Sequence, residues 1–205
     1  MPIMEQQGVK MHYQTSGRGE PAIAFVHGIG STWRVWQHQM EMNSKKHLIV
    51  APDVPGHGES DAGPGGFENF MLAGDMINCL MSDTFDLNYV AVGHSAAGIT
   101  LLRLMSIDRT RLKGVVFVDC PRDIPSEAFW QLHGLHESAS ATSIPRLIID
   151  ASIGTPDSRF ESLAGLLGVT GDDHIIMRGA DHRFFSSHPE ALYDPLQRII
   201  AAGAI

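Results

Sequence analysis

The sequence predicts an α/β fold: a three-layer α/β/α sandwich in which helices cover both faces of a mostly parallel, eight-stranded sheet. Short apolar or β-branched runs alternate with longer segments of helical period, which is typical of strand–helix–strand crossovers. The chain has 205 residues, of which 43% are hydrophobic and 19% charged, so it can bury one sizeable core. We therefore expect a single domain over residues 1–205.

Strands are expected where a short apolar run ends at turn-forming residues. Gly8 separates the first two strands, which we expect to pair as an antiparallel hairpin, and the helices between the later strands favour parallel pairing. The eight expected strands cover residues 2–7, 9–15, 21–27, 47–52, 88–93, 114–120, 145–150 and 173–178.

Helices are expected where apolar residues recur with a period near 3.6. The segment 67–83 shows the pattern best, because one face collects Phe70, Ala73, Ile77, Leu80 and Met81, as a helix packed on a sheet should. The polar, small residues of 136–145 indicate a surface loop. The expected helices cover residues 33–42, 67–83, 96–107, 126–137, 159–167 and 189–202.

Charge and composition exclude several classes of function. The formal net charge is −8, and no run of Lys and Arg offers a surface for nucleic acid or anionic lipid. The N-terminus lacks a signal-peptide pattern, and no apolar stretch approaches the roughly 18 residues of a membrane span. We expect a soluble, cytoplasmic protein whose two cysteines, Cys79 and Cys120, are reduced thiols.

The segment Gly93-His94-Ser95-Ala96-Ala97 joins an apolar run to a helical one. A serine hydroxyl needs presentation on a sharp turn and a neighbouring base before it becomes a nucleophile. Small residues two before and two after such a serine let strand and helix approach closely. The pattern G-x-S-x-G is incomplete because Ala97 replaces the last glycine, so on its own the motif fits a packing turn equally well.

Three other segments accompany this turn, in a fixed order along the chain. An apolar run leads into His27-Gly28-Ile29-Gly30, the next leads into Asp53 to Ser60, and a late run is followed by His182. Together with the turn at Ser95, these segments resemble the α/β-hydrolase superfamily over essentially the whole chain. The resemblance implies the α/β-hydrolase fold, and four motifs in the right order and spacing are specific.

The resemblance also implies roles for individual residues. Ser95 corresponds to the nucleophile of an acyl-transfer reaction and His182 to its general base. The backbone N–H groups of Ala96 and Ile29 correspond to the oxyanion hole. A nucleophilic aspartate, as in the superfamily's dehalogenases and epoxide hydrolases, is excluded because residue 95 is serine.

The acid that orients His182 is left open by the sequence. Gly154 stands where the family usually carries the acid. Asp119, at the end of the strand 114–120, is the first candidate, because some relatives supply their acid from that position. Asp157 is the alternative if the later loop is longer than usual, and Asp123 and Asp150 rank behind both.

Other residues near the expected site have competing interpretations. Gly28, Trp33 and His94 are candidate substrate-binding residues, although a structural role explains His94, and a packed helix face explains Trp33 and Trp36. His27 is expected to order the oxyanion loop, and His57 to stabilise its own loop. His133 and His136 share a helical turn, but no carboxylate or cysteine cluster completes a metal site. We expect no metal and no cofactor.

The stretch between Cys120 and Pro145 is too short for the helical lid of many relatives. Residues 121–144 are therefore a remnant in place of the lid, and the apolar surface so left offers an interface for a homodimer. The function expected is a carboxylesterase-like serine hydrolase that cleaves a small acyl substrate through an acyl-enzyme. Alternatives are thioesterase, lactonase, C–C hydrolase, perhydrolase or haloperoxidase, hydroxynitrile lyase, or a catalytically silent ligand-binding or interaction protein.

Overall fold

The computed structural model describes residues 2–108, 110–120, 134–135, 137–153 and 161–203. Several sequence predictions fall outside these residues: the acid candidates Asp123 and Asp157, the vacant acid position Gly154, and the histidine pair His133 and His136. Most of the expected helix 126–137 and the first residues of the expected helix 159–167 also lie outside.

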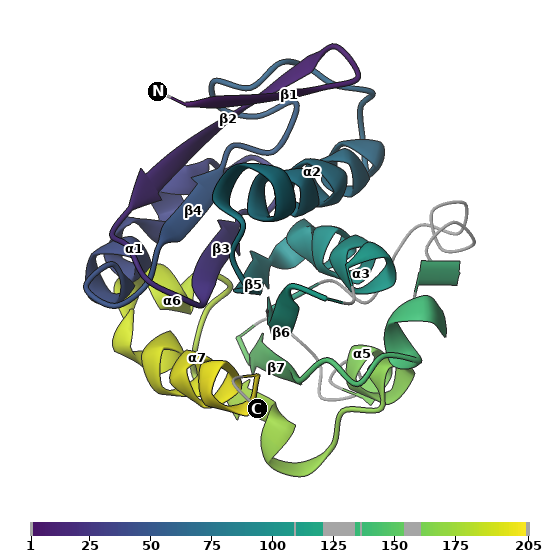
Figure 1. Ribbon diagram of the computed structural model, residues 1–205. Coiled ribbons are helices and arrows are strands. Elements are labelled where there is room, and N and C mark those ends of the chain that lie inside the picture. The colour runs from purple at the N-terminus through teal and green to yellow at the C-terminus, as the bar shows by residue number, and fades with distance from the viewer. Residues whose placement is uncertain (1, 109, 121–133, 136, 154–160, 204–205) are drawn as a thin grey trace.

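The described residues form one mixed sheet of eight strands (Figure 1), in the order β1-β2-β4-β3-β5-β6-β7-β8. Strand β2 runs antiparallel to β1 and β4, and every other neighbouring pair is parallel. All eight predicted strands are thus confirmed, with ends shifted by up to two residues. The bounds are β1 Ile3–Gln6, β2 Val9–Ser16, β3 Ala22–Val26, β4 Ile49–Pro52, β5 Tyr89–His94, β6 Leu112–Val118, β7 Arg146–Ala151 and β8 His174–Met177.

The predicted hairpin turns at Gln7 and Gly8, which pair Gln6 with Val9. Both turn residues have positive φ, 54° and 77°. This is the left-handed backbone that two-residue hairpin loops require, because it matches the twist of the flanking strands.

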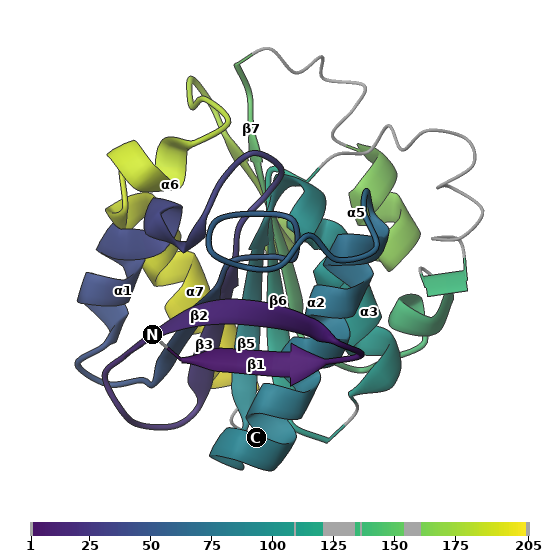
Figure 2. The same ribbon diagram turned by 90° about the horizontal axis from the view of Figure 1, so that it is seen from above.

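Helices cover both faces of the sheet, so the molecule has the three layers predicted (Figure 2). One apolar core lies between the sheet and α2, α3 and α5, and a second lies under α1, α6 and α7. The predicted face of α2 is buried, from Phe70 to Ile77. The bounds are α1 Gln37–Asn43, α2 Glu68–Cys79, α3 Gly98–Ile107, α5 Glu161–Leu167, α6 Phe184–Ser187 and α7 Glu190–Ala202.

The helix ends differ from the prediction in ways that local backbone geometry explains. The expected helices at 33 and 96 begin with 3₁₀ turns, Trp33–Trp36 and Ser95–Ala97, and α2 continues as a π-helix over Leu80–Phe85. The helix α6 was not predicted, since four residues are too few to show a helical period. The expected loop 136–145 contains helical residues at 137–140.

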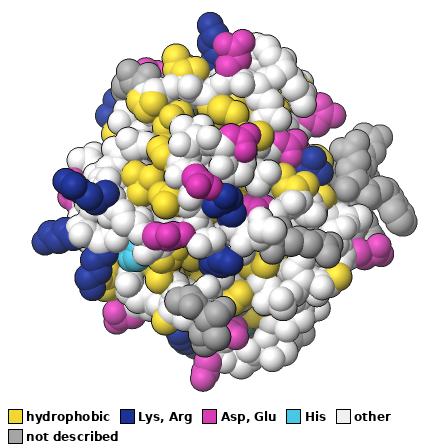
Figure 3. Space-filling view, in the orientation of Figure 1, with side chains coloured by type: hydrophobic (Ala, Val, Ile, Leu, Met, Phe, Trp, Pro, Cys, Tyr) yellow, Lys and Arg dark blue, Asp and Glu magenta, His cyan; other side chains and the backbone are white. Residues whose placement is uncertain are grey.

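The surface carries charges of both signs. On the face seen in Figure 3, acidic and basic side chains are interspersed, and no broad area of one sign is visible. Among the described helices, none is long and apolar enough to cross a membrane.

Candidate active site

Five loops bring the predicted site residues to one edge of the sheet. Parallel strands β3, β4, β5 and β6 end at this edge, and their last residues are followed at once by His27, Asp53, Ser95 and Asp119. His182 arrives from the loop between β8 and α6. This placement matches the general position of ligand sites in sheets of this type, outside the carboxyl ends of the strands.

Ser95 lies on a strained turn between β5 and the 3₁₀ turn before α3. Its φ is +54°, a left-handed conformation that is uncommon for residues other than glycine and that persists where surrounding packing enforces it. The packing is close: a Cβ added at Gly28 would lie 2.7 Å from the Cβ of Ser95. Ser95 Oγ forms no hydrogen bond with any residue that the structure describes, His182 included, and the Ser95 side chain is half-buried.

The departure at Ala97 from the glycine pattern has a structural explanation. Ala97 has ordinary helical geometry, with φ of −64°, so glycine is not needed for the backbone. The close approaches fall on its neighbours instead: a Cβ at Gly93 would lie 2.9 Å from Leu101 Cγ, and one at Gly98 would lie 3.1 Å from Cys120 Sγ. Sequence reasoning missed this role of Gly98.

His182 is paired with Asp119, the first of the acids that the sequence offered. Nδ1 of His182 donates to Oδ2 of Asp119 over 2.5 Å. The other carboxylate oxygen accepts the N–H of Ala151 at 3.1 Å, and the Asp119 N–H donates to the Ile149 carbonyl at 2.7 Å. These bonds fix the carboxylate against the end of β7. Asp150 bonds instead to Nε2 of His174, at 2.8 Å.

His94, the residue before the serine, supports the loop that carries His182. Its Nε2–H donates to the backbone carbonyl of His182 over 2.8 Å, and its ring lies 4.4 Å from the His182 ring and 4.7 Å from that of Phe185. Burial, together with the neighbouring charge of His182, lowers the pKa of His94 to about 4. A neutral, buried His94 fits the structural role better than substrate binding.

His27 ties the loop after β3 to the loop after β4. The Val54 N–H donates to Nε2 of His27 over 3.0 Å, so Nδ1 carries the proton and donates to the carbonyl of Gly28 at 2.8 Å. Burial lowers the pKa of His27 to about 4. The two bonds hold Gly28, and with it the backbone leading to Ile29, in one position, as predicted for an ordering residue.

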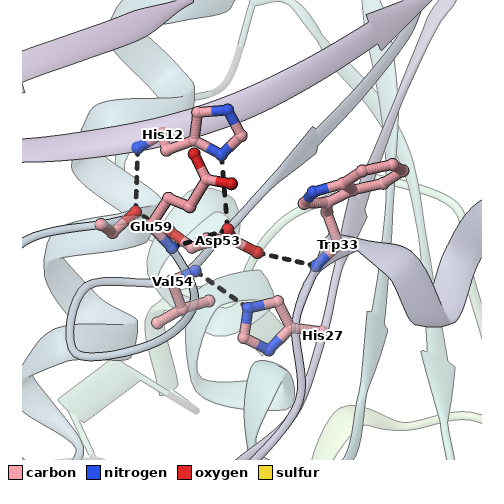
Figure 4. A network of polar contacts seen from close by, with 7 residues as sticks. His12, His27, Trp33, Asp53, Val54 and Glu59 are labelled. Carbon is pink, nitrogen blue, oxygen red and sulfur yellow. Dashed lines mark hydrogen bonds and ion pairs between the residues drawn. The ribbon is translucent and has the colours of Figure 1, made fainter. Parts of the chain in front are cut away.

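Asp53 is the centre of the polar network drawn in Figure 4. Its carboxylate accepts the N–H groups of Trp33 and Glu59 over 2.8 and 3.1 Å and faces Nδ1 of His12 at 3.3 Å. Ser60 Oγ donates to the Asp53 carbonyl and accepts the His12 N–H. No local pattern indicates that His12, on β2, belongs to this group, because the contact is between distant parts of the chain.

The two tryptophans near the oxyanion loop have different surroundings. Trp36 is buried and stacks between Phe25 and Phe185, with ring centroids 5.0 and 4.4 Å away, which confirms its packing role. Trp33 is half-buried, and the guanidinium of Arg34 lies 4.8 Å from its ring centroid. Contact between Trp33 and a substrate stays a prediction.

Ile29 stands at the mouth of a cavity of about 360 Å³. Its side chain is 63% exposed, and the cavity continues between the loop after β4 and the first turn of α2. No group of three or more potential metal ligands was found among the residues that the structure describes. The other lining residues are Gly56, His57, Gly66, Phe67, Asn69 and Phe70.

Comparison with known proteins assigns the chain to one family. A family model described as "Alpha/beta hydrolase family" matches residues 23–168. Epoxide hydrolase 4 of Mus musculus is 34% identical over 104 residues, which cover 47% of this chain and 27% of the relative. The chain spans only about a quarter of the first curated relatives that it matches.

Solved structures extend the likeness to nearly the whole chain. A thermophilic esterase from Thermogutta terrifontis superposes with a TM-score of 0.76 at 17% identity, over 97% of this chain and 98% of that one. The enol-lactonase from Burkholderia xenovorans LB400 gives a TM-score of 0.75 at 15% identity, over 98% and 100%. At such low identity these structures show a shared fold alone.

Proposed function

Because the chain belongs to the alpha/beta hydrolase family, we propose that it is a serine hydrolase that cleaves a carboxylic ester through an acyl-enzyme intermediate. One observation supports this proposal above the others. Ser95 lies on a strained turn, its neighbour His94 is bonded to the backbone carbonyl of His182, and His182 Nδ1 is bonded to the fixed carboxylate of Asp119. A nucleophile, a base and an orienting acid are residues of these three types.

In the proposed reaction, these three side chains act in turn. Ser95 Oγ attacks the ester carbonyl carbon, and Nε2 of His182 takes the hydroxyl proton while Asp119 holds the ring in the correct tautomer. The oxyanion is met by the N–H groups of Ala96 and Ile29. His182 then protonates the leaving alcohol, and water, activated by the same histidine, hydrolyses the acyl-enzyme and releases the acid.

Preorganisation of the oxyanion loop supplies much of the expected rate. The loss of one oxyanion donor typically costs about 2.7–4 kcal/mol of transition-state stabilisation, so the position of Ile29 matters. His27 and Asp53 hold this loop through buried and partly buried hydrogen bonds. A loop fixed in this way needs no reorganisation when charge develops on the substrate oxygen.

The named relatives bear on the choice of bond. The esterase and the enol-lactonase act, by their names, on acyl compounds, in line with a serine at position 95. Several relatives in sequence are named epoxide hydrolases. The superfamily's epoxide hydrolases use a nucleophilic aspartate, so we propose acyl transfer rather than epoxide opening for this chain.

Hydrolysis of p-nitrophenyl acetate and butyrate tests the proposal. We expect turnover by the wild type and a loss of more than about 10⁴-fold in kcat on Ser95→Ala, as for other serine triads. Ser82→Ala, which removes a hydroxyl bonded to the neighbouring Asp83 side chain, is the matched control and should retain the wild-type rate. A wild type without activity, or an unchanged rate in Ser95→Ala, would overturn the proposal.

A further inference from the structure

The cavity beside Ile29, called here the Ile29 cavity, has no role in the reaction steps described so far. Its volume is about 360 Å³, within the range of small-molecule sites. Ile29, whose N–H is assigned to the oxyanion hole, lines its mouth. A group bound in the cavity would therefore lie next to the proposed oxyanion donor Ile29.

The strand order decides which part of an ester can reach this cavity. Along the sheet edge the loops follow the order β4, β3, β5, β6, β7, β8. The cavity belongs to the loop after β4, and the oxyanion loop and Ser95 follow on β3 and β5. His182 comes from beyond β8 and bonds to Asp119 at the end of β6, so it lies on the opposite side of Ser95.

The protonation step then assigns the two halves of the ester. His182 must donate its proton to the leaving alcohol, so the alcohol faces His182. The acyl group points the other way, toward β4 and the Ile29 cavity. We infer that the Ile29 cavity is the acyl pocket and that it selects neutral, apolar acyl groups of medium length. This inference rests on the proposed function.

The lining chemistry indicates a neutral, apolar occupant. Ile29, Phe67 and Phe70 provide apolar surface, and the polar side chains among the described lining residues are His57 and Asn69, with no Lys, Arg, Asp or Glu. A charged acyl group would lose its hydration there without a permanently charged partner, which is costly. At about 30 Å³ for each water-sized group, the volume suits on the order of ten non-hydrogen atoms.

Hydrogen bonds of Asn69 hold the wall of the cavity in place. Asn69 is buried, and its Oδ1 accepts the N–H of Gly65 over 2.8 Å while its Nδ2 donates to the Ala62 carbonyl at 3.2 Å. Gly56 has a φ of +81°, and a Cβ there would lie 2.5 Å from Asn69 Nδ2. The loop is therefore held against α2, which keeps the cavity open before a substrate binds.

A series of p-nitrophenyl esters from acetate to dodecanoate tests the inference. For the wild type, kcat/KM should rise by about fourfold for each methylene buried and level off near octanoate, where the cavity is full. Phe67→Trp, which fills the cavity, should move the optimum to esters shorter by at least two carbons. Phe67→Ala should move it to longer esters.

Phe85 provides the matched control. It is partly buried against the same apolar core as Phe67, but it lies on the π-helix and contacts Tyr13, with ring centroids 6.4 Å apart. Phe85→Trp and Phe85→Ala should leave the length optimum unchanged. If the Phe67 variants also leave it unchanged while Ser95→Ala abolishes ester hydrolysis, the inference is overturned and the proposed function stands.

A binding measurement separates the two failures further. Calorimetric titration of Ser95→Ala with 2-nonanone, a neutral ketone with the octanoyl chain, needs no turnover. We expect binding that Phe67→Trp weakens by at least fivefold and Phe85→Trp leaves unchanged. Absence of binding, or equal affinity in both variants, would overturn the acyl pocket, whether or not the protein hydrolyses esters.

Discussion

The site has two sides. On the buried side, polar side chains with little exposure fix the loops after β3 and β4, whereas on the exposed side the side chain of His182, in the loop after β8, is about half exposed to solvent. His27 and Asp53 are 0% and 1% exposed, and each side chain makes two or more hydrogen bonds, of which at least one joins the two loops. The His182 side chain is 54% exposed. It is held by one side-chain bond to Asp119 and by the bond from His94 to its carbonyl.

The difference in burial follows from the proposed roles of the two sides, which are oxyanion stabilisation and proton transfer. Oxyanion donors work best when they are preorganised, because reorientation during the reaction would cost part of the stabilisation they provide. A base that receives and returns a proton needs the correct tautomer and access to the substrate. A single orienting carboxylate is sufficient for that purpose, so we expect the two sides to respond differently to substitution.

The largest effect on kcat is expected on the exposed side, where the orientation of the His182 ring depends on its one bond to Asp119. Asp119→Asn replaces the acceptor of the His182 Nδ1–H with an amide that favours the wrong tautomer, so kcat should fall by about 10⁴-fold. Stability should change little by comparison, which urea unfolding will show. Ester hydrolysis by Asp157→Asn, the alternative acid in the sequence, provides the control. Equal and small losses in both variants would show that neither carboxylate orients His182.

A substitution on the buried side should lower the free energy of unfolding as well as kcat. In Asp53→Asn, an amide group replaces a carboxylate oxygen among the donors of Trp33, Glu59 and His12, and broken buried pairs of this kind cost about 3–5 kcal/mol. The loosened oxyanion loop should lower kcat by up to about 100-fold. Asp61→Asn is the control, since the carboxylate of exposed Asp61 also accepts a backbone N–H, that of Lys10. A fully stable Asp53→Asn would break the contrast between the two sides.

The last effect expected is a pH dependence of stability that comes from the two buried histidines, His27 in the loop after β3 and His94 at the end of β5. The pKa values of His27 and His94 lie near 4, below the ordinary 6.5. Between these values the unfolded chain binds protons that the folded chain does not, so stability falls as pH falls from about 6.5 toward 4. Each histidine contributes about 3 kcal/mol over that range.

Urea unfolding at pH 7 and at pH 4.5 measures this dependence. His27→Gln should reduce the pH dependence by roughly half, because one of the two buried rings is gone. His38→Gln, at an exposed position on α1, should leave the dependence unchanged. A stability that does not vary between these pH values would contradict the buried, neutral state of both rings.

Local patterns in the sequence were sufficient for the strands, the hairpin at Gly8 and the turn at Ser95. These features depend on residues close together in the chain, such as Gly93 before the serine. The partner of His182 could be ranked but not decided, because the choice between Asp119 and Asp157 depends on how β6, β7 and the loop after β8 meet. The part played by His12 was out of reach for the same reason.

Labelling with a fluorophosphonate tests the central claim most directly, because the reagent reacts with an activated serine and needs no knowledge of the substrate. Peptide mapping of the labelled wild type should place one adduct on Ser95, with no adduct in Ser95→Ala and labelling slowed by at least about 100-fold in His182→Ala. An unlabelled wild type, or equal labelling in Ser95→Ala, would contradict the claim that Ser95 is a nucleophile activated by the His182–Asp119 pair.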